Sequence, residues 1–334
     1  MTTKNYRWLA GCICGAVVLV SGLVNSQTSN GDPPDNDIAG NDSPAGVSGG
    51  FNGMVNTACA YDPYTGNARR VIDDIVVPGT LGAYPLKWTR YYNSRDPDIG
   101  NALGIGWRHS YMWSEDYLGG DIVHFADGRE VDFQEASGIS ERLLQVGQLI
   151  LSDGGQVIFE PVTYNLPDGQ HTKYRVARII DPYGLTTTIS YENIGTDDNG
   201  NDVYRMSRIT EPGGRYLLLN YSAADGTQIS GVQAFTADNN LTQSVTYAYS
   251  YMAATGGYFT TLTGASYSDG TAAQYTYQND NSGKNGSPKI PLLQTCDDVR
   301  YAGPMHQIQY LFVAGDRIRG KIKSEMKPGS GEAV

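Results

Sequence analysis

The stretch Asp181-Pro182-Tyr183-Gly184-Leu185-Thr186-Thr187-Thr188-Ile189-Ser190-Tyr191 decides the fold of this chain, because it joins a tight turn to an aromatic strand. Asp-Pro-x-Gly favours a type I or type II turn, since proline presets its own φ and glycine accepts a positive φ. The threonine, isoleucine and tyrosine that follow are typical of a pleated strand. One turn and one strand therefore form a unit, with Tyr191 seven residues after Gly184.

The same unit recurs along the chain. Similar turns contain Gly128, Gly154, Gly184, Gly214 and Gly270, at intervals of 26, 30, 30 and 56 residues, and Asn240 divides the last interval. Aromatic residues follow at fixed offsets: Tyr191, Tyr221, Tyr247 and Tyr277 stand seven residues after a turn residue, and Phe133, Phe159 and Tyr275 stand five after. Residues five and seven positions after the turn residue lie on the same face of a strand, because successive side chains alternate between its two faces. We expect six repeated units of strand, turn, aromatic strand and loop, which pair into an extended sheet or solenoid; a generic antiparallel β-sandwich is the alternative.

The composition favours an all-β fold, an antiparallel β-hairpin repeat array. The 334 residues include 41 Gly and 24 Tyr, which suit turns and half-buried strands. Ser140–Gln148 is the one short segment predicted to be helical. With 35 acidic and 24 basic side chains the net charge is −11, which disfavours nucleic-acid partners and anionic membrane surfaces.

Residues 1–26 are predicted to direct export. Lys4 and Arg7 are the only charges before an uncharged run of 17 residues, Trp8–Val24. A cleaved signal peptide and a retained N-terminal anchor both fit a run of this length. Residues 27–56 are rich in Gly, Asn, Asp and Pro, and we expect them to form a flexible linker.

The cysteines divide into two pairs. Cys12 and Cys14 lie in the export segment, where Leu9-Ala10-Gly11-Cys12 resembles a lipobox but precedes most of the apolar run. Cys59 and Cys296 remain, and in an exported protein they can form one disulfide or stay as two unpaired thiols.

A second group of motifs precedes the repeats. They are Asp62-Pro63-Tyr64-Thr65-Gly66-Asn67, Val76-Val77-Pro78-Gly79, Leu86-Lys87-Trp88-Thr89-Arg90-Tyr91-Tyr92-Asn93-Ser94 and Leu103-Gly104-Ile105-Gly106-Trp107. Together with the repeats, they resemble the RHS, or YD-repeat, family of bacterial surface and secreted proteins, whose lead-in domain carries TG, R-x-Y-x-S and G-x-GW in this order. The resemblance implies a β lead-in domain at 57–120, YD-like hairpin repeats at 121–320 and a C-terminal tail at 321–334.

The resemblance also implies a structural role without catalytic residues or cofactors. Its implied structural residues are Gly66, Arg90, Tyr92, Ser94, Gly104, Gly106 and Trp107, with the turn glycines and strand tyrosines given above. Relatives carry more repeats and a C-terminal toxin or effector, so the implied partners are further RHS repeats or such a domain. A fragment, a truncated product and a subunit of a larger shell all fit the six or seven units of this chain.

The lead-in residues agree with a scaffold when they are read individually. Leu86, Trp88 and Tyr91 predict a strand with one buried face, and Gly104 and Gly106 allow tight backbone turns beside a large indole. Arg90 either pairs with an acidic residue or remains a solvated charge.

Few residues have the spacing that a metal site or a pair of catalytic carboxylates requires. The four histidines lack ligand spacing for zinc. The adjacent carboxylates Asp73/Asp74 and Glu115/Asp116 point to opposite faces of a strand, so we expect solvated edge charges and no glycosidase pair. The loop with Asp197, Asp198, Asn199 and Asp202 is either a weak calcium site or a plain acidic hairpin loop.

Three functions compete on this basis. A non-enzymatic, exported RHS-type scaffold follows from the motifs and the repeat. The tyrosine-rich faces also fit a module that binds a surface glycan or another cell-surface ligand. A polysaccharide hydrolase rests on the acidic residues alone, and it ranks last.

Overall fold

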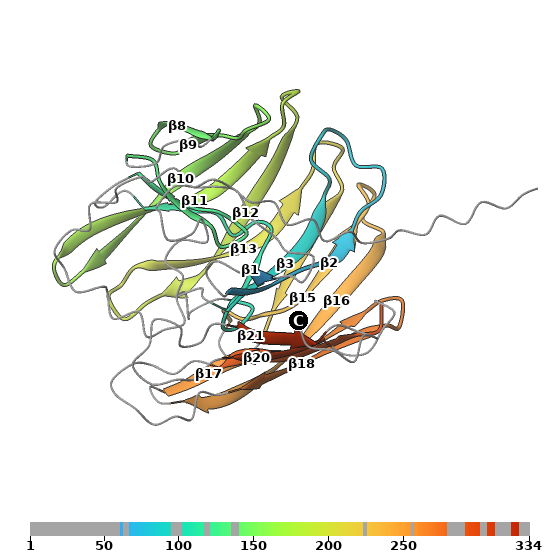
Figure 1. Ribbon diagram of the computed structural model, residues 1–334. Coiled ribbons are helices and arrows are strands. Elements are labelled where there is room, and N and C mark those ends of the chain that lie inside the picture. The colour runs from blue at the N-terminus through green and yellow to red at the C-terminus, as the bar shows by residue number, and fades with distance from the viewer. Residues whose placement is uncertain are drawn as a thin grey trace, which may run out of the picture. The chain divides into compact units, whose positions relative to one another are not determined.

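The computed structural model describes residues 61–62, 67–94, 102–116, 121–134, 140–222, 226–254, 257–278, 291–300, 306–310 and 322–326. Every regular element within these ranges is a β-strand, so the all-β prediction is confirmed (Figure 1). No helix in the described ranges has the length and apolar character to cross a bilayer. The predicted export segment, the linker, Gly66 and Cys59 lie outside the described residues.

A small antiparallel sheet, here called the lead-in sheet, comes first. Its strands pair in chain order: β1 (Tyr61–Asp62), β2 (Asn67–Val76), β3 (Lys87–Asn93) and β4 (Trp107–His109). On β3, the side chains of Trp88, Arg90 and Tyr92 are buried, while Tyr91 lies on the other face and is half-buried. Thr89 and Asn93, on the same face as Tyr91, are buried as well, so the prediction that one face alone is buried is wrong. Trp88 is buried as predicted, but Tyr92 takes the place expected for Tyr91.

The remaining strands form hairpins. They are β5 (Ser114–Asp116), β6 (Ile122–His124), β7 (Glu130–Asp132), β8 (Arg142–Gln145), β9 (Gln148–Ile150), β10 (Gln156–Leu166), β11 (Gly169–Ile180), β12 (Thr186–Thr196), β13 (Asp202–Thr210), β14 (Tyr216–Tyr221), β15 (Ile229–Phe235), β16 (Leu241–Ala254), β17 (Gly257–Tyr267), β18 (Ala272–Gln278), β19 (Leu292–Asp298), β20 (His306–Tyr310) and β21 (Ile322–Met326). From β8 to β21 each strand pairs antiparallel with the next, and we call this array the hairpin ribbon. Strands β5 to β7 form a meander whose β5 pairs with β11.

The six predicted turns share one hydrogen-bond pattern. In each, the first residue donates its N–H to the carbonyl four residues on, and the fourth residue donates back to the first. The fourth residue is Gly128, Gly154, Gly184, Gly214 or Gly270, with φ between 85° and 91°. In the remaining turn it is Asn239, with φ 63°, and not the predicted Asn240. This is a type I turn followed by a left-handed residue, a common closure of three-residue hairpin loops.

A β-bulge recurs beside one aromatic residue per unit. The pairing register shifts immediately before Phe159, Tyr191, Tyr221, Tyr249 and Tyr277. The four tyrosines donate their hydroxyls to a backbone carbonyl of an earlier strand: Tyr191 to Val176 at 2.8 Å, Tyr221 to Met206 at 2.5 Å, Tyr249 to Ile229 at 2.5 Å and Tyr277 to Leu262 at 2.8 Å. Tyr249 therefore occupies the repeat position that the sequence assigned to Tyr247. In each unit, a buried or half-buried hydroxyl therefore joins the two strands on either side of the repeat turn.

The predicted helix at Ser140–Gln148 is wrong. The segment forms the hairpin β8–β9, in which Leu143 pairs with Leu149 and Gly147 has φ 86°. The Gly147 N–H donates to the carboxylate of Glu115, 32 residues earlier, at 3.0 Å. A long-range partner therefore fixes the turn, and a local apolar pattern cannot reveal it.

The two sheets share one core. Trp88 and Trp107 from the lead-in sheet belong to the same cluster of buried side chains as Leu217, Val232 and Val245 from the ribbon. Strand β2 lies beside β16 (Figure 1). The junction between the sheets is thus the place where a functional arrangement has to be sought.

Candidate functional site at the junction of the two sheets

A β-bulge on β2 turns one carboxylate into the protein. Asp73 pairs with Thr89 and Ile75 pairs with Trp88, which leaves Asp74 as the extra residue between them. The Asp74 side chain is fully enclosed, whereas that of Asp73 is 43% exposed. Bulges re-aim side chains in this way. The prediction of solvated edge charges is therefore wrong for Asp74.

Arg90 on β3 meets this carboxylate. Its Nε and Nη2 atoms lie 2.5 and 2.9 Å from the two Asp74 oxygens, and the arginine is 0% exposed. Nη2 also donates to the hydroxyl of Tyr275 at 2.9 Å. Of the two readings of Arg90, the ion pair is confirmed and the solvated charge is excluded.

Ribbon tyrosines surround the ion pair, and among the described residues the buried Arg90 Nη1 alone of its nitrogens has no hydrogen-bond partner. The hydroxyls of Tyr247 and Tyr267 donate to Asp74 at 2.5 and 2.7 Å. The guanidinium carbon of Arg90 lies 5.2 and 5.3 Å from the ring centroids of Tyr247 and Tyr275. The lead-in sheet thus supplies both charges, and the ribbon supplies the groups that solvate them.

Electrostatics hold these groups in one protonation state. Burial has the largest single effect on the pKa of Arg90 and lowers it, but the Asp74 carboxylate together with Tyr275 and Tyr247 outweighs burial and keeps that pKa above its ordinary value. Burial, reinforced by Asp74, raises the pKa of Tyr247 well above the usual value for tyrosine, and burial raises that of Tyr275 as well. The tyrosine hydroxyls therefore remain donors at neutral pH, and the cluster acts as a fixed connection between the sheets.

Indole and backbone groups add further hydrogen bonds across the junction. Trp88 Nε1 donates to the Tyr247 hydroxyl and Trp107 Nε1 to the Tyr277 hydroxyl, both at 2.8 Å. The backbone N–H of Leu293 donates to the Tyr92 hydroxyl at 2.7 Å. The polar atoms of Trp88, Trp107 and Tyr92 are thus each satisfied by the ribbon.

The glycines near Trp107 are required by close approach. Gly104 and Gly106 have φ 86° and 73°. A Cβ on Gly104 would lie 2.9 Å from the Thr260 carbonyl oxygen, and one on Gly106 would lie 2.8 Å from the Tyr92 ring. The expectation of tight turns beside an indole agrees with these contacts. Ser94 closes the neighbouring edge by accepting the Ala68 N–H at 2.9 Å.

The segment between β2 and β3, residues 77–86, crosses the ends of three consecutive hairpins, and we call it the clamp loop. The Tyr84 hydroxyl donates to Asp153 at 2.7 Å, the Ala83 N–H to Asp181 at 2.7 Å, and the Leu81 N–H to Glu211 at 3.2 Å. These acids belong to turns that start at residues 151, 181 and 211. The loop therefore contacts three consecutive repeat turns.

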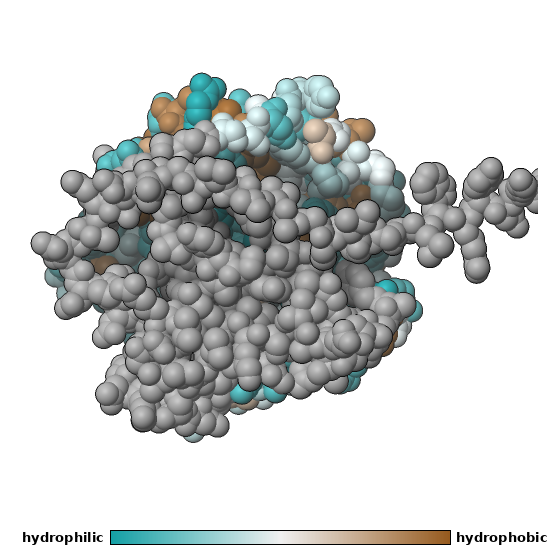
Figure 2. Space-filling view, viewed as in Figure 1, coloured by the Kyte–Doolittle hydropathy of each residue, from teal (hydrophilic) through white to brown (hydrophobic). Residues whose placement is uncertain are grey.

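The three acids that accept hydrogen bonds from the clamp loop, Asp153, Asp181 and Glu211, are called the clamp acids, and backbone donors keep Asp181 ionised. Burial disfavours ionisation of Asp181, but N–H groups of Ala83, Leu185, Tyr183 and Gly184 outweigh it, so its pKa lies below the ordinary value. Arg215 adds a bond from its Nη1 to the Pro78 carbonyl at 2.6 Å. In Figure 2, apolar and polar surface lie side by side along the coloured upper part of the view. Leu81 of the clamp loop is 50% exposed.

The other candidate residues have local structural contacts. Asp197 accepts the N–H groups of Asn199 and Asn201, which closes the hairpin β12–β13 at Gly200 with the same pattern as the six repeat turns. Within the described ranges no three His, Cys, Asp or Glu side chains are grouped to hold a metal ion, and Asp198 and Asp202 of this loop are among the residues searched. Asp197 therefore closes the hairpin by accepting backbone N–H groups of its own loop, and the calcium site stays a prediction.

The second carboxylate pair and the cysteine complete the survey. Glu115 is buried and Asp116 half-buried, so the expected solvated charges are wrong for Glu115; burial raises its pKa, and the Gly147 N–H opposes that rise. Asp116 contacts His124 at 3.1 Å. Cys296 is buried, and its proposed disulfide partner Cys59 lies outside the described residues, so the disulfide stays a prediction.

Sequence reasoning missed the clamp acids and the position of Asp74. A signal existed for the acids, because Asp181 and Glu211 each stand directly before a proline at the start of a repeat turn. No sequence signal separates Asp74 from Asp73, since the bulge depends on pairing with β3.

Comparison with known proteins identifies one stretch of the chain. Residues 61–133 match the model of a domain of unknown function, DUF6531. This stretch contains the lead-in sheet and the meander β5–β7. No curated protein matches the chain.

Solved structures resemble the chain distantly. The crystal structure of TcdB2-TccC3 has 11% sequence identity and a TM-score of 0.45, covering 64% of this chain and 16% of that one. The Photorhabdus luminescens Tc holotoxin pore has 11% identity and a TM-score of 0.42, covering 75% and 16%. The N-terminal domain of effector protein SpvB from Salmonella typhimurium strain LT2 has 13% identity and a TM-score of 0.32, covering 69% and 99%. This chain thus spans about one sixth of the TcdB2-TccC3 chain that it matches.

Proposed function

We propose that this chain is an exported β scaffold of the RHS, or YD-repeat, family, a structural part of a surface or toxin-delivery protein without a catalytic domain of its own. The observation that carries the proposal is the enclosed Asp74–Arg90 ion pair with its ribbon tyrosines. These buried charges connect the lead-in sheet to the ribbon, and a substrate cannot reach them because both side chains are enclosed.

The repeated fastening of the ribbon supports the same role. The hydroxyl of Tyr221 on β14 bonds to the backbone of β13 across a repeat turn, and the clamp loop contacts consecutive turns through Asp181 and Glu211. An array whose strands are joined across their turns and whose consecutive turns share one loop is suited to holding further sequence in a defined geometry. The lead-in motifs and the repeat supply the family assignment, and the toxin-associated role follows from that assignment.

Two measurements test the proposal. The first is fractionation of a bacterial host that expresses the chain with its own N-terminus; we expect recovery in the periplasm or medium, and recovery in the cytoplasm alone contradicts export. The second is affinity capture of the chain from its native host, followed by mass spectrometry. The proposal expects an effector or toxin polypeptide, covalently continuous or bound. Capture of the chain with no such polypeptide contradicts toxin delivery.

A separate assay tests the absence of catalysis. The purified chain is incubated with soluble polysaccharides, and reducing ends are measured over time. We expect no release above a heat-denatured control. Release that Asp74→Asn and Glu115→Gln abolish while the fold is retained contradicts a purely structural role.

A further inference from the structure

The outer edge of β10, the edge that faces away from β11, is open over a short stretch. Strand β9 pairs with β10 only over Gln156–Ile158, whereas β11 pairs with it as far as Leu166. The Phe159 N–H donates to the Gly147 carbonyl at 2.8 Å, which closes one end of the open stretch. A groove of about 350 Å³ lies beside this stretch, within the range of ~300–1,000 Å³ common for ligand sites.

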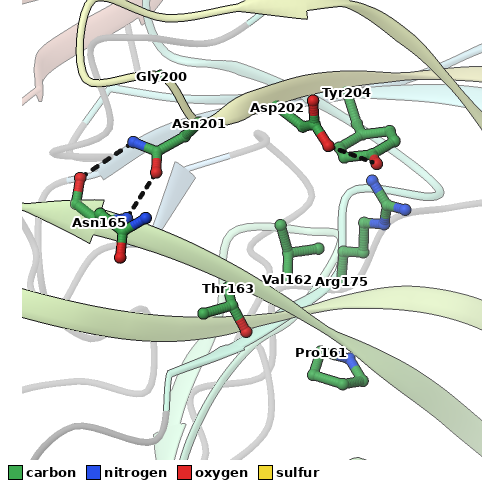
Figure 3. Close-up of a pocket in the computed structure, with 9 residues that line it drawn as sticks. All are labelled: Pro161, Val162, Thr163, Asn165, Arg175, Gly200, Asn201, Asp202 and Tyr204. Atoms are coloured by element: carbon green, nitrogen blue, oxygen red, sulfur yellow. Dashed lines mark hydrogen bonds between the residues drawn. The ribbon is translucent and has the colours of Figure 1, made fainter.

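A side-chain amide closes the other end of the stretch and takes the place of a strand. Asn201 accepts the Asn165 N–H at 2.6 Å and donates to the Asn165 carbonyl at 3.0 Å, as Figure 3 shows. A neighbouring antiparallel strand makes the same two bonds with its own C=O and N–H groups. Asn201 is buried, and its Nδ2 also donates to Asp197 at 2.9 Å. The edge of β10 thus already binds an amide group in the manner of sheet pairing.

Two residues between these ends direct backbone groups outward. Residues of an antiparallel strand alternate between pairing with one neighbour and facing the other. Phe159 and Asn165 face outward, so Pro161 and Thr163 of the same alternation also face outward. Within the described residues, neither the N–H and carbonyl of Thr163 nor the carbonyl of Pro161 has a hydrogen-bond partner at this edge, and both residues are exposed. Three backbone groups are therefore unpaired along about 20 Å of edge.

Pro161 limits what this edge can pair with. Proline has no N–H to donate, and a proline on an edge strand prevents continued sheet growth. Gly147 and Asn201 already occupy the two ends of the stretch. The opening therefore suits an extended segment of about four residues and excludes a long strand.

The groove beside the opening contains one charge without a counter-charge. Arg175 donates from its Nε to Glu160 at 2.7 Å, so its own charge is balanced. Asp202 accepts the Tyr204 hydroxyl at 3.3 Å (Figure 3), and among the described residues no cation pairs with it. Tyr204 is 41% exposed, and its ring offers a surface on which an alkyl stem can pack. A lysine or arginine side chain fits both groups, because its stem is apolar and its end is cationic.

We propose that the outer edge of β10 binds an extended segment of another polypeptide, with a basic side chain in the groove. The segment adds to the sheet through main-chain hydrogen bonds to Thr163 and Pro161, while Asp202 selects the side chain. The net charge of −11 also favours a basic partner. The predicted linker of this chain, residues 27–56, does not fit, because it contains four aspartates and neither lysine nor arginine. This binding does not rest on the scaffold function proposed above.

Titration of the full chain with designed peptides tests this edge. The probes are acetylated and amidated pentapeptides that have a central lysine or arginine between valine and threonine residues, and a matched peptide with a central glutamate. We expect saturable binding of the basic peptides by NMR, with protection of the Thr163 amide from hydrogen exchange. The glutamate peptide should bind about tenfold more weakly. Methylation of the backbone nitrogens of the basic peptides should abolish binding, because the carbonyls of β10 then lack donors.

Variants of the chain separate main-chain pairing from side-chain contact. Thr163→Pro removes an outward N–H and no bond to β11, so it should abolish binding, whereas Thr163→Val keeps the N–H and should bind as the parent does. Asp202→Asn should weaken binding of the basic peptides by about tenfold. Asp198→Asn is its matched control, since Asp198 is an exposed acid of the same loop that does not line the groove. Circular dichroism checks that each variant is folded.

Several outcomes would overturn the proposal. They are failure of both basic peptides to bind, equal binding of the glutamate peptide, undiminished binding of the methylated peptides, and undiminished binding to folded Thr163→Pro. The methylated peptides test the same hydrogen bonds on the unaltered chain. Dimerisation of the chain that Thr163→Pro abolishes would assign the edge to a second copy and contradict binding of a partner. None of these results affects the scaffold proposal, because the cluster around Asp74 and Arg90 involves other strands.

Discussion

Replacing Asp74 by alanine would leave Arg90 charged inside the protein. Arg90 is 0% exposed and directs Nε and Nη2 at the carboxylate. The hydroxyls of Tyr247 and Tyr267 would lose their acceptor in the same step. Removing one partner of a buried ion pair costs about 3–5 kcal/mol, a large share of a typical unfolding free energy of about 5–15 kcal/mol. We therefore expect Asp74→Ala to lower the free energy of unfolding by at least 3 kcal/mol, on the order of the lower bound for such pairs.

Urea denaturation followed by tryptophan fluorescence measures this loss, because Trp88 donates to the Tyr247 hydroxyl within the same cluster. Asp73→Ala is the matched control. Asp73 is the preceding residue of β2, its side chain is 43% exposed, and it contacts Lys87 and Thr89. An exposed ion pair contributes about 1 kcal/mol or less. If the two variants lower the free energy of unfolding by the same amount, the claim that the Asp74–Arg90 ion pair stabilises the junction is refuted.

Three further changes probe other parts of the structure. Tyr221→Phe removes a hydroxyl bonded to the backbone of the preceding strand, β13, and should lower the free energy of unfolding by about 1 kcal/mol in thermal unfolding. Tyr183→Phe, at 82% exposure, should leave it unchanged, and equal effects would argue against the hydroxyl contact. Gly82→Ala and Gly270→Ala both place alanine at a positive φ, which costs about 1–2 kcal/mol of backbone energy. The Cβ at residue 82 would also meet the Asp181 carboxylate, whereas the Cβ at residue 270 would meet nothing, so urea titration should show the larger loss of stability for Gly82→Ala. Burial, aided by Arg108, lowers the pKa of His109 to about 3, so the unfolded chain binds the extra proton and stability should fall by about 2 kcal/mol between about pH 7 and pH 5. His109→Phe should remove that slope, and an unchanged slope would assign it to other groups.

The turns could be predicted because their chemistry is local. The fourth position of each repeat turn has a positive φ, a backbone conformation that glycine accepts, and Gly128, Gly184 and Gly270 occupy this position. In the unit without glycine, the predicted left-handed residue, Asn240, is one position after the observed one, Asn239. Both asparagines tolerate a positive φ, and only the hydrogen bonds that close the turn select Asn239.

Contacts that depend on pairing could not be predicted. Tyr247 fits the offset of the repeat, but the bulge on β16–β17 places Tyr249 at the repeated position and leaves Tyr247 to bind Asp74. The clamp loop meets Asp181 and Glu211, 98 and 130 residues along the chain. Sequence spacing contains no information about such partners until the register of every intervening strand is known.

The lead-in sheet and the hairpin ribbon form one cooperative unit, and native-state hydrogen exchange in low urea tests this most directly. Amides of β3 and β17, which lie on the two sides of the Asp74–Arg90 cluster, should open with the same free energy and the same dependence on urea. A lower opening free energy in β3, with β17 still protected, would show that the lead-in sheet unfolds by itself and would contradict the account.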